Sequence, residues 1–222
     1  MESKLLNKLR VLVACECSQI VCKAFRSVGC EAYSADIELC LGGHPEWHIV
    51  GDVSRILDGH CAFNLQTGEV MQIRRSWDII IAHPPCTYLT KIGSPLMYMP
   101  DGSIDPVRDA AQIVGREFFL KCLNADAHYV CVENPVPMAR ANLPRCSTII
   151  NPYEFGEPWS KRTCLWLRNL PPLIPTLLNS SHREFVRTRR GSRARSMFFP
   201  KVAQAMAEQW TEYILHDINP FN

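Results

Sequence analysis

Short apolar runs alternate with helical patterns along most of the chain. Six runs rich in aliphatic and β-branched side chains are too short for helices and predict strands, at residues 8–14, 31–35, 48–53, 77–82, 128–132 and 161–167. Amphipathic spacing predicts helices, at residues 20–28, 106–123 and 201–215. Because strands and helices alternate, the pattern predicts an α/β protein built on a doubly wound, mostly parallel sheet.

Several residues mark where these elements begin and end. The first helix is expected to stop at Gly29, and Asp105 is expected to cap the helix that starts at Pro106. Ser54 is expected to cap a brief helix. The intervening stretch 87–106 predicts a loop, and it is longer than the usual loop of about four to six residues, which favours a functional role.

Other segments carry weaker patterns. Residues 59–75 are ambiguous, with a turn at 66–69 that indicates an insertion. A short helix is expected near 138–143, and 148–159 is expected to be irregular. Residues 170–175 form a Pro-rich connector.

The composition is that of an ordinary globular protein. The chain has 222 residues, of which 47% are hydrophobic and 21% charged, and this predicts one domain spanning residues 1–222. No apolar run approaches the roughly 20 residues that a membrane span needs, and the first residues lack the apolar region of a signal peptide. A cytoplasmic location is therefore expected.

Cysteine and histidine give little sign of a metal site. The 11 cysteines include no Cys-x-x-Cys pair, and the single-residue spacing of Cys15 and Cys17 does not suit zinc. His44 and His48 lie in a Gly- and Pro-containing loop without a cysteine or carboxylate framework. Reduced thiols and no bound metal are the expectation.

The net charge of +2 is too small to indicate a nucleic-acid partner, but its distribution is uneven. Arginines gather in one segment near the C-terminus, at positions 183, 187, 189, 190, 193 and 195. Such a cluster is suited to phosphate groups. The alternative is a solvated surface segment.

Acidic residues follow two of the predicted strands. Asp36 ends the second strand and Asp52 the third. At the carboxyl edge of an open α/β sheet, such carboxylates can hold the ribose hydroxyls and the adenine amino group of an adenosyl ligand. Aspartate is also common at strand ends and helix caps, so a structural role remains the alternative for each.

Two further strand ends carry reactive side chains. Cys86 follows Pro84 and Pro85 after one strand, and Glu133 closes another. In a parallel sheet both emerge at the same edge, where a thiolate and a carboxyl group can attack an electrophilic ring together. A pyrimidine fits, with the thiolate adding at C6 and the acid acting at N3. Burial is expected to raise the pKa of Glu133 and keep it protonated. The alternative is that Cys86 is a buried structural thiol.

These motifs resemble the DNA cytosine-5 methyltransferase family. The similar elements are Pro84-Pro85-Cys86, Glu133-Asn134, Gly51-Asp52-Val53, Asp36, Lys161-Arg162-Thr163 and the last helix from Phe199 to Trp210. The whole chain is most similar to short phage and prophage proteins of this kind, which share its Cys-Glu-x-Ser start, its His-Pro-Pro-Cys-Thr-Tyr centre and its Thr-Cys-Leu-Trp-Leu strand.

The resemblance implies a methyltransferase fold of the Rossmann-like type that uses S-adenosylmethionine and acts on DNA. It assigns the catalytic roles to Cys86 as nucleophile, Glu133 as the partner of N3, and Arg162 on the arginine-bearing strand. It assigns the cofactor to residues of the first strand ends, namely Cys15, Glu16, Cys17, Ser18, Asp36, Ile37, Asp52, Val53 and Pro84.

The chain departs from the family pattern in two places. Residues 15–19 contain no glycine where the family has a glycine-rich turn, although Ser18 can still donate to the methionine carboxylate of the cofactor. Residues 169–198 hold only a Pro-rich linker and an Arg-rich segment in place of a large recognition domain.

The missing recognition domain suggests a DNA target that is flipped or single-stranded. Five arginines would bind its phosphates without reading bases, at positions 187, 189, 190, 193 and 195. Two alternatives stay open: C5 modification of a free pyrimidine nucleotide, and a degenerate methyltransferase fold that serves as a nucleic-acid-binding or regulatory protein.

Overall fold

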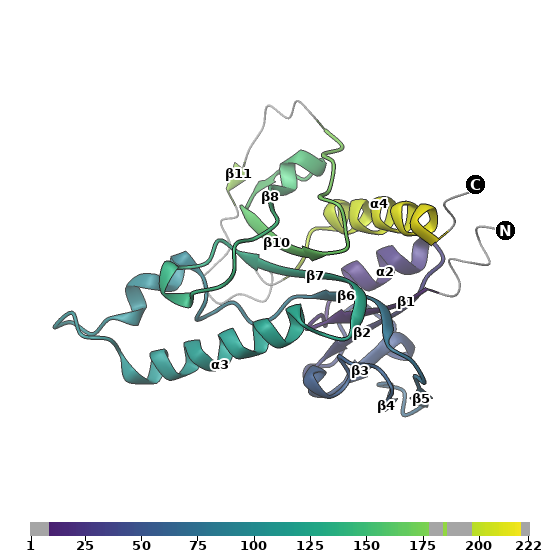
Figure 1. Ribbon diagram of the computed structural model, residues 1–222, viewed down its shortest axis with the longest axis horizontal. Helices are drawn as coiled ribbons and strands as arrows, with labels where there is room; N and C mark the ends of the chain where they lie inside the picture. Colours follow the sequence, from purple (N-terminus) through teal and green to yellow (C-terminus); the bar gives the residue numbers. More distant parts are fainter. Residues whose placement is uncertain (1–8, 178–183, 186–196, 219–222) are drawn as a thin grey trace.

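The molecule is built around a central sheet that curves between two helical layers. A computed structural model describes residues 9–177, 184–185 and 197–218. Within these ranges, seven strands pair in the order β3-β2-β1-β6-β7-β10-β8 (Figure 1). Their bounds are Arg10–Ala14 (β1), Glu31–Asp36 (β2), His48–Val50 (β3), Trp77–Ala82 (β6), Ala127–Pro135 (β7), Thr148–Ile150 (β8) and Thr163–Arg168 (β10).

The sheet is mostly parallel. Strands β1, β2, β3, β6 and β7 run the same way, and β10 is antiparallel to both of its neighbours, β7 and β8. This arrangement confirms the predicted doubly wound, mostly parallel α/β sheet.

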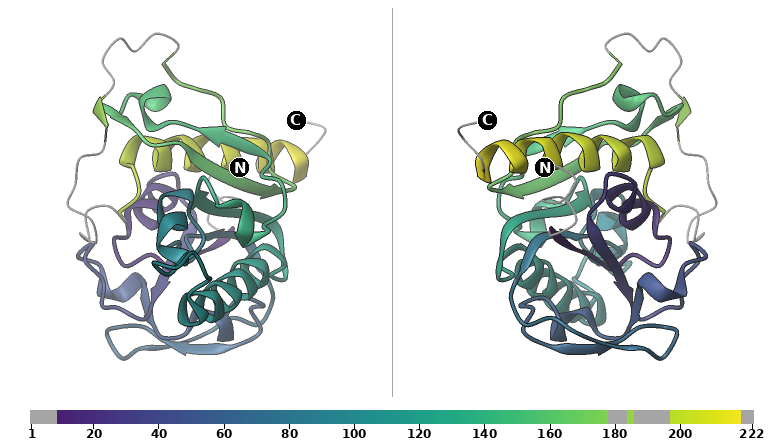
Figure 2. Two further views of the ribbon diagram at one scale, coloured as in Figure 1. Left: turned by 90° about the vertical axis from the view of Figure 1, so that its left-hand side faces the viewer. Right: turned by 90° about the vertical axis from the view of Figure 1, so that its right-hand side faces the viewer.

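Helices cover both faces of the sheet. Helices α2 (Ile20–Ser27) and α4 (Pro200–Ile218) pack together on one face, and α3 (Pro106–Leu123) lies on the other (Figures 1 and 2). Alternate residues of a strand point to opposite faces. Ile79 and Ile81 of β6 are therefore buried in the core on the α2 and α4 side, whereas Ile80 is buried with Phe119 of α3.

The order of the strands reverses at β1. From β1 the chain builds outward through β2 and β3, and it then returns to add β6 and β7 on the other side of β1. This reversal is a topological switch point, and open α/β sheets bind ligands at the carboxyl ends of the strands there. The neighbouring ends of β1 and β6 therefore define where a site is expected.

Most predicted element boundaries agree with the structure. The capping role of Asp105 is confirmed, because its carboxylate accepts hydrogen bonds from the N–H groups of Val107 (2.9 Å) and Arg108 (3.2 Å). The insertion at 59–75 is a hairpin of β4 (Ala62–Asn64) and β5 (Val70–Gln72) around the predicted turn.

Four local predictions were wrong or incomplete. Segment 148–159, predicted irregular, contains β8 and the short helix η5 (Pro152–Phe155), because pairing with distant β10 orders it. The helix expected at 138–143 is one 3-10 turn, η4 (Ala139–Ala141), ended by left-handed Asn142. The helix η2 (Val53–Arg55) is capped by Asp52 and not by Ser54. The loop after Cys86 includes the 3-10 helix η3 (Lys91–Met97).

The remaining elements are small and lie at the margins. A 3-10 turn, η1 (Pro45–Trp47), precedes β3, and β9 (Trp159–Ser160) pairs with β11 (Glu184–Phe185). Among the described residues, no helix combines the length and the apolar character that crossing a bilayer requires.

Candidate active site

The carboxyl ends of four neighbouring strands bring several functional side chains to one edge of the sheet. In the register of the parallel pairs, Ala14 of β1 lies opposite Ala35 of β2 and Ala82 of β6. Ala82 in turn lies opposite Val132 of β7. The residues that follow these positions in the chain are Cys15, Asp36, His83 and Glu133.

The turn that carries Cys86 is fastened to the end of β7. The Cys86 carbonyl accepts hydrogen bonds from the next residues of the turn, including Leu89 N–H at 3.0 Å. Beyond the turn, Lys91 N–H donates to the Val136 carbonyl (2.9 Å). Met138 N–H donates to the Leu89 carbonyl (2.8 Å). Backbone hydrogen bonds thus hold the half-buried Cys86 loop beside the segment that follows Glu133.

His83 contacts Glu133 directly. The His83 Nδ1 atom lies 3.3 Å from Glu133 Oε2, and the two side chains are 11% and 10% exposed. The His83 N–H donates to the Ala14 carbonyl (2.9 Å), which fixes the residue to the sheet beyond the last paired position of β6. The Phe198 ring packs on the imidazole with centroids 4.9 Å apart. No motif in the sequence assigns His83 a role; its position between a strand and Pro84-Pro85 is the signal that could have found it.

The pKa of Glu133 is lowered, contrary to the expectation from its burial. Burial alone would raise this pKa, but the hydrogen bond with His83 and the positive charge of Lys161 together outweigh it. Glu133 is therefore ionised near neutral pH. Because an ionised carboxylate can only accept, His83 Nδ1 carries the hydrogen of this contact. The burial argument failed because it omitted the two cationic or donor groups that other elements bring to Glu133.

The site contains polar atoms without partners. Across residues 9–177 and the two shorter described ranges, three buried side-chain atoms have no hydrogen-bond partner, namely His83 Nε2, Glu133 Oε1 and Asn134 Oδ1. Leaving such an atom unpaired costs about 1–3 kcal/mol. A ligand that donates a hydrogen bond to Glu133 Oε1 would remove that cost, so this oxygen is available as an acceptor.

Glu16 and Ser18 face the start of α2. The Glu16 carboxylate accepts hydrogen bonds from Val21 N–H (2.7 Å), Cys22 N–H (3.1 Å) and Ser18 Oγ (3.2 Å). Burial raises the pKa of Glu16, while the nearby His83 charge and these donors lower it in part. The anion-binding groups of this helix N-terminus are thus taken by the protein itself. A methionine carboxylate would need other donors.

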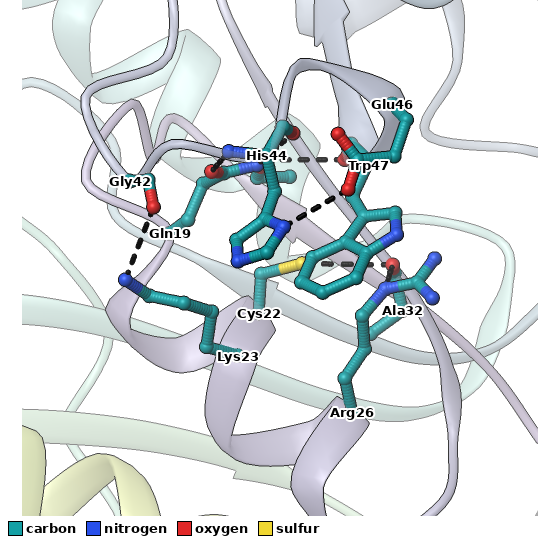
Figure 3. A network of polar contacts seen from close by, with 10 residues as sticks. Gln19, Cys22, Lys23, Arg26, Ala32, Gly42, His44, Glu46 and Trp47 are labelled. Carbon is teal, nitrogen blue, oxygen red and sulfur yellow. Dashed lines mark hydrogen bonds and ion pairs between the residues drawn. The ribbon is translucent and has the colours of Figure 1, made fainter.

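The glycine-free turn before α2 is stabilised by Gln19. Gln19 has φ 59° and ψ 19°, the left-handed conformation that glycine usually occupies. Its Nε2 donates to the His44 carbonyl (2.8 Å) and to Ser34 Oγ (3.2 Å), and its Oε1 accepts from His44 N–H (3.0 Å). Figure 3 shows Gln19 between Gly42 and His44. The side chain thereby ties the loop after β2 to the turn that follows β1.

The residues predicted for the adenosyl group lie around the ends of β2 and β3. Ile37 is 78% exposed beside Asp36, so its apolar surface is available to a planar ring. The Asp52 carboxylate accepts from Ser54 N–H and Oγ, which lowers its pKa. Burial raises the pKa of Cys15, and Cys122 and the carboxylates of Asp36 and Asp52 raise it further.

The other residues predicted to bind the cofactor lie at the same edge and differ in how far their side chains are buried. Val53 and Pro84 are buried, and Cys17 is half-buried, with its carbonyl accepting from Leu41 N–H at 2.7 Å. Of the groups expected to hold S-adenosylmethionine, the α2 amides that could bind its carboxylate are occupied by Glu16.

The cationic side chain that lowers the pKa of Glu133 is Lys161 and not Arg162. Lys161 lowers the pKa of Glu133, and its Nζ lies 5.6 Å from the centroid of the Phe199 ring. Arg162 is exposed at the start of β10, and its charge acts on Cys164. The structure thus brings Cys86 and Glu133 to one edge but gives Arg162 no contact with Glu133.

The predicted phosphate-binding residues lie outside the described residues. These are Arg187, Arg189, Arg190, Arg193 and Arg195. The described ranges contain no group of three or more His, Cys, Asp or Glu side chains that could hold a metal ion. His44 stacks on Trp47, and His48 bonds to Ser34 Oγ (2.8 Å) and to the Glu38 carbonyl (2.9 Å).

Comparison with models of known protein families gives no match, and comparison with curated proteins gives none either. Among solved structures, the chain is similar to an E. coli protein described as a "putative DNA modification methyltransferase encoded within prophage". The two are 13% identical with a TM-score of 0.47, over 79% of this chain and 53% of the other. This chain thus spans about half the length of that protein.

Proposed function

We propose that the protein is a C5-pyrimidine methyltransferase that acts on cytosine in DNA, with Cys86 as nucleophile and Glu133 as the group that binds the base edge. The observation that carries the proposal is the fastening of the Cys86 loop to the end of β7, next to a buried Glu133 whose Oε1 has no partner in the described chain. A nucleophile and a polar group held together at a sheet edge suit covalent catalysis on a ring.

The chemistry assigned to the chain begins at Cys86. Its thiolate sulfur forms a bond to C6 of the pyrimidine, and the electrons of the C5=C6 bond shift toward C4 and N3, where a proton from solvent is taken up. S-adenosylmethionine, when bound, would supply the methyl group that C5 accepts. Loss of the C5 proton and the N3 proton to solvent, and of the Cys86 sulfur from C6, then restores the neutral aromatic ring and the thiolate, and the cofactor would leave as S-adenosylhomocysteine.

Glu133 is proposed to bind the 4-amino edge of cytosine. Through Oε1 it can accept from the 4-amino group, and from N3–H once N3 is protonated. A 4-oxo group would instead place lone pairs against the carboxylate, although the N3–H of uracil could donate to it.

The cofactor is proposed to bind along the ends of β1, β2 and β3. Asp36 and Asp52 would hold the ribose hydroxyls and the adenine amino group, Ile37 would pack on the adenine, and residues 15–18 with Val53 and Pro84 would line the remainder. Isothermal titration calorimetry with S-adenosylmethionine and S-adenosylhomocysteine tests this. Absence of binding to both would favour the degenerate, nucleic-acid-binding alternative.

DNA is proposed as the polymer because the Arg-rich segment in 169–198 can neutralise phosphates. Arg187, Arg189, Arg190, Arg193 and Arg195 would bind the backbone of a flipped or single-stranded target. Affinity for an oligonucleotide should then fall steeply with salt, with a log–log slope that becomes shallower by about 0.7–0.9 for each arginine replaced by glutamine that contacts a phosphate. A slope unchanged by these replacements would contradict the assignment.

The decisive experiment traps the covalent intermediate. The protein is incubated with S-adenosylmethionine and either a 5-fluorocytosine oligonucleotide or 5-fluoro-dCMP, and the mass of the protein is measured. A stable adduct on Cys86 with the oligonucleotide is expected. Cys86→Ser should abolish it while leaving cofactor binding intact, and Cys61→Ser, at a half-buried cysteine before β4, is the matched control. An adduct with the nucleotide alone would refute the DNA substrate.

A further inference from the structure

His83 stands between two buried carboxylates at the switch point of the sheet. It follows β6, whereas Glu16 follows β1 and Glu133 lies near the carboxyl end of β7. His83 Nδ1 bonds to Glu133 Oε2, and the His83 charge also acts on Glu16. Glu16 has its own donors at the start of α2, so the hydrogen bond from His83 goes to Glu133 alone.

The two oxygens of Glu133 are therefore not equivalent. Oε2 is engaged by His83, and Oε1 is buried without a partner in the described chain. A carboxylate on a long side chain can rotate about its last bond, so one oxygen must be held if the other is to keep a fixed direction. His83 can hold it because its own backbone is fixed to β1 and its ring is packed by Phe198.

We infer that His83 is a positioning residue, whose Nδ1–H holds Oε2 of Glu133 so that Oε1 is presented to the target pyrimidine. The inference rests on the proposed function and adds a residue to its machinery. His83 touches neither substrate nor reacting atoms in this role; it acts through Glu133.

The pKa of Glu133 provides a measurement that distinguishes the two roles of His83, because it should not change if His83 has only a structural role. The groups that lower the pKa of Glu133 are His83, after β6, and Lys161, before β10. The Glu133 carboxylate in turn raises the pKa of the neighbouring Cys131 and Cys164 thiols. Removing the His83 donor leaves burial as the main influence, so the pKa of Glu133 should rise. The acidic limb of the pH profile for adduct formation should then move to higher pH.

The test compares His83→Leu with His83→Asn. Leucine removes the donor, whereas the asparagine Nδ2 lies close to where the imidazole Nδ1 was and can still donate. Adduct formation with the 5-fluorocytosine oligonucleotide should slow by about 10- to 100-fold in His83→Leu, as for loss of a hydrogen bond to a charged group. His83→Asn should recover most of the rate and the wild-type acidic limb. His128→Asn, at the exposed start of β7, is the matched control.

The outcomes separate this inference from the proposed function. If the wild-type protein forms no adduct, the proposed function fails. If it does and His83→Leu has the wild-type rate and pH profile, the inference is overturned. If His83→Leu and His83→Asn slow adduct formation equally and the acidic limb of the pH profile does not move, the inference is also overturned, because this result would show that His83 has only a structural role.

A second measurement needs neither substrate nor a destabilising variant of His83. In the 15N NMR spectrum of the imidazole, the Nδ1 resonance of His83 should shift when Glu133 is replaced by Gln, because the partner changes from a carboxylate to an amide. An unchanged Nδ1 resonance would show that the hydrogen bond is absent and would overturn the inference.

Discussion

The side chain of Gln19 lies so close to Gly42 that a Cβ added at position 42 would be 2.4 Å from Gln19 Cβ and 2.5 Å from its Oε1. The close approach lets one glutamine bond to the loop after β2 while its backbone makes the turn before α2. The first turn therefore forms without glycine because a side-chain network offsets the strain of the left-handed backbone.

We predict that Gln19→Ala destabilises the protein by about 2–3 kcal/mol, since three hydrogen bonds to Ser34 and His44 are lost. Gln19→Gly should be less damaging by about 1 kcal/mol, because glycine adopts the left-handed conformation without strain. Urea denaturation measures both. Gln204→Ala, which removes a solvent-exposed hydrogen bond to Glu208 within α4, is the control, with a change within about 0.5 kcal/mol. Equal stability of the two Gln19 variants would contradict the strain argument.

The lowered pKa of Glu133 predicts a specific pH dependence of stability. A carboxyl group whose pKa falls below its ordinary 4.5 on folding stabilises the protein above about pH 4.5. That stabilisation is lost as the pH drops through the folded-state pKa. Glu133→Gln cannot titrate, so the difference in unfolding free energy between wild type and variant should be constant from pH 7 to about pH 5 and change below. Urea titrations across this range test it; a difference constant down to acid unfolding would refute the pKa direction.

Lys161 and Arg162 should differ in their effect on Glu133. Lys161→Met removes a positive charge that lowers the pKa of Glu133, so this pKa should rise. Arg162→Met should leave it nearly unchanged, because Arg162 is exposed and acts on Cys164. Titration of the Glu133 side-chain carboxyl by 13C NMR distinguishes the two. A larger rise in Arg162→Met would restore Arg162 as the functional cation.

Arg168 of β10 stabilises the connection between α3 and β7. Its guanidinium donates to the carbonyl of Leu123 at the end of α3 (3.2 Å) and to those of Ala125 and Ala127 (2.6 Å) in and after the connection. Arg168→Met should therefore cost about 2–3 kcal/mol of unfolding free energy.

Thermal and urea denaturation check the Arg168 prediction. Arg168→Lys should be intermediate, because one ammonium group cannot reach all three carbonyls in the same geometry. Arg116→Met, which removes one exposed hydrogen bond to the Asn142 carbonyl, is the matched control and should cost less than about 1 kcal/mol. A loss in Arg116→Met as large as that in Arg168→Met would show that the Arg168 hydrogen bonds are not the cause.

Some of the candidate site could be predicted from the chain order alone. Asp36, Glu133 and Cys86 were placed at strand ends because apolar runs stop before them, and the parallel register does bring those ends to one edge. The cap Asp105 was predictable because it bonds to residues two and three positions away. Local signals of this kind depend on few residues, which is why they were reliable.

Contacts between distant segments were not predictable in this way. Strand β8 has three residues and exists through its pairing with β10, so its own sequence gave no signal. The contact of His83 with Glu133 joins residues 50 positions apart, and Gln19 reaches His44 over 25.

The sequence by itself determined the alternation of strands and helices, the two prolines before Cys86 and the acids at the strand ends, because these follow from periodicity and local backbone chemistry. Only the tertiary structure decided the ionisation of Glu133 and the folding of a turn without glycine. Both depend on distances between groups from separate elements, and burial acts against the charge of Glu133 until His83 and Lys161 are brought beside it.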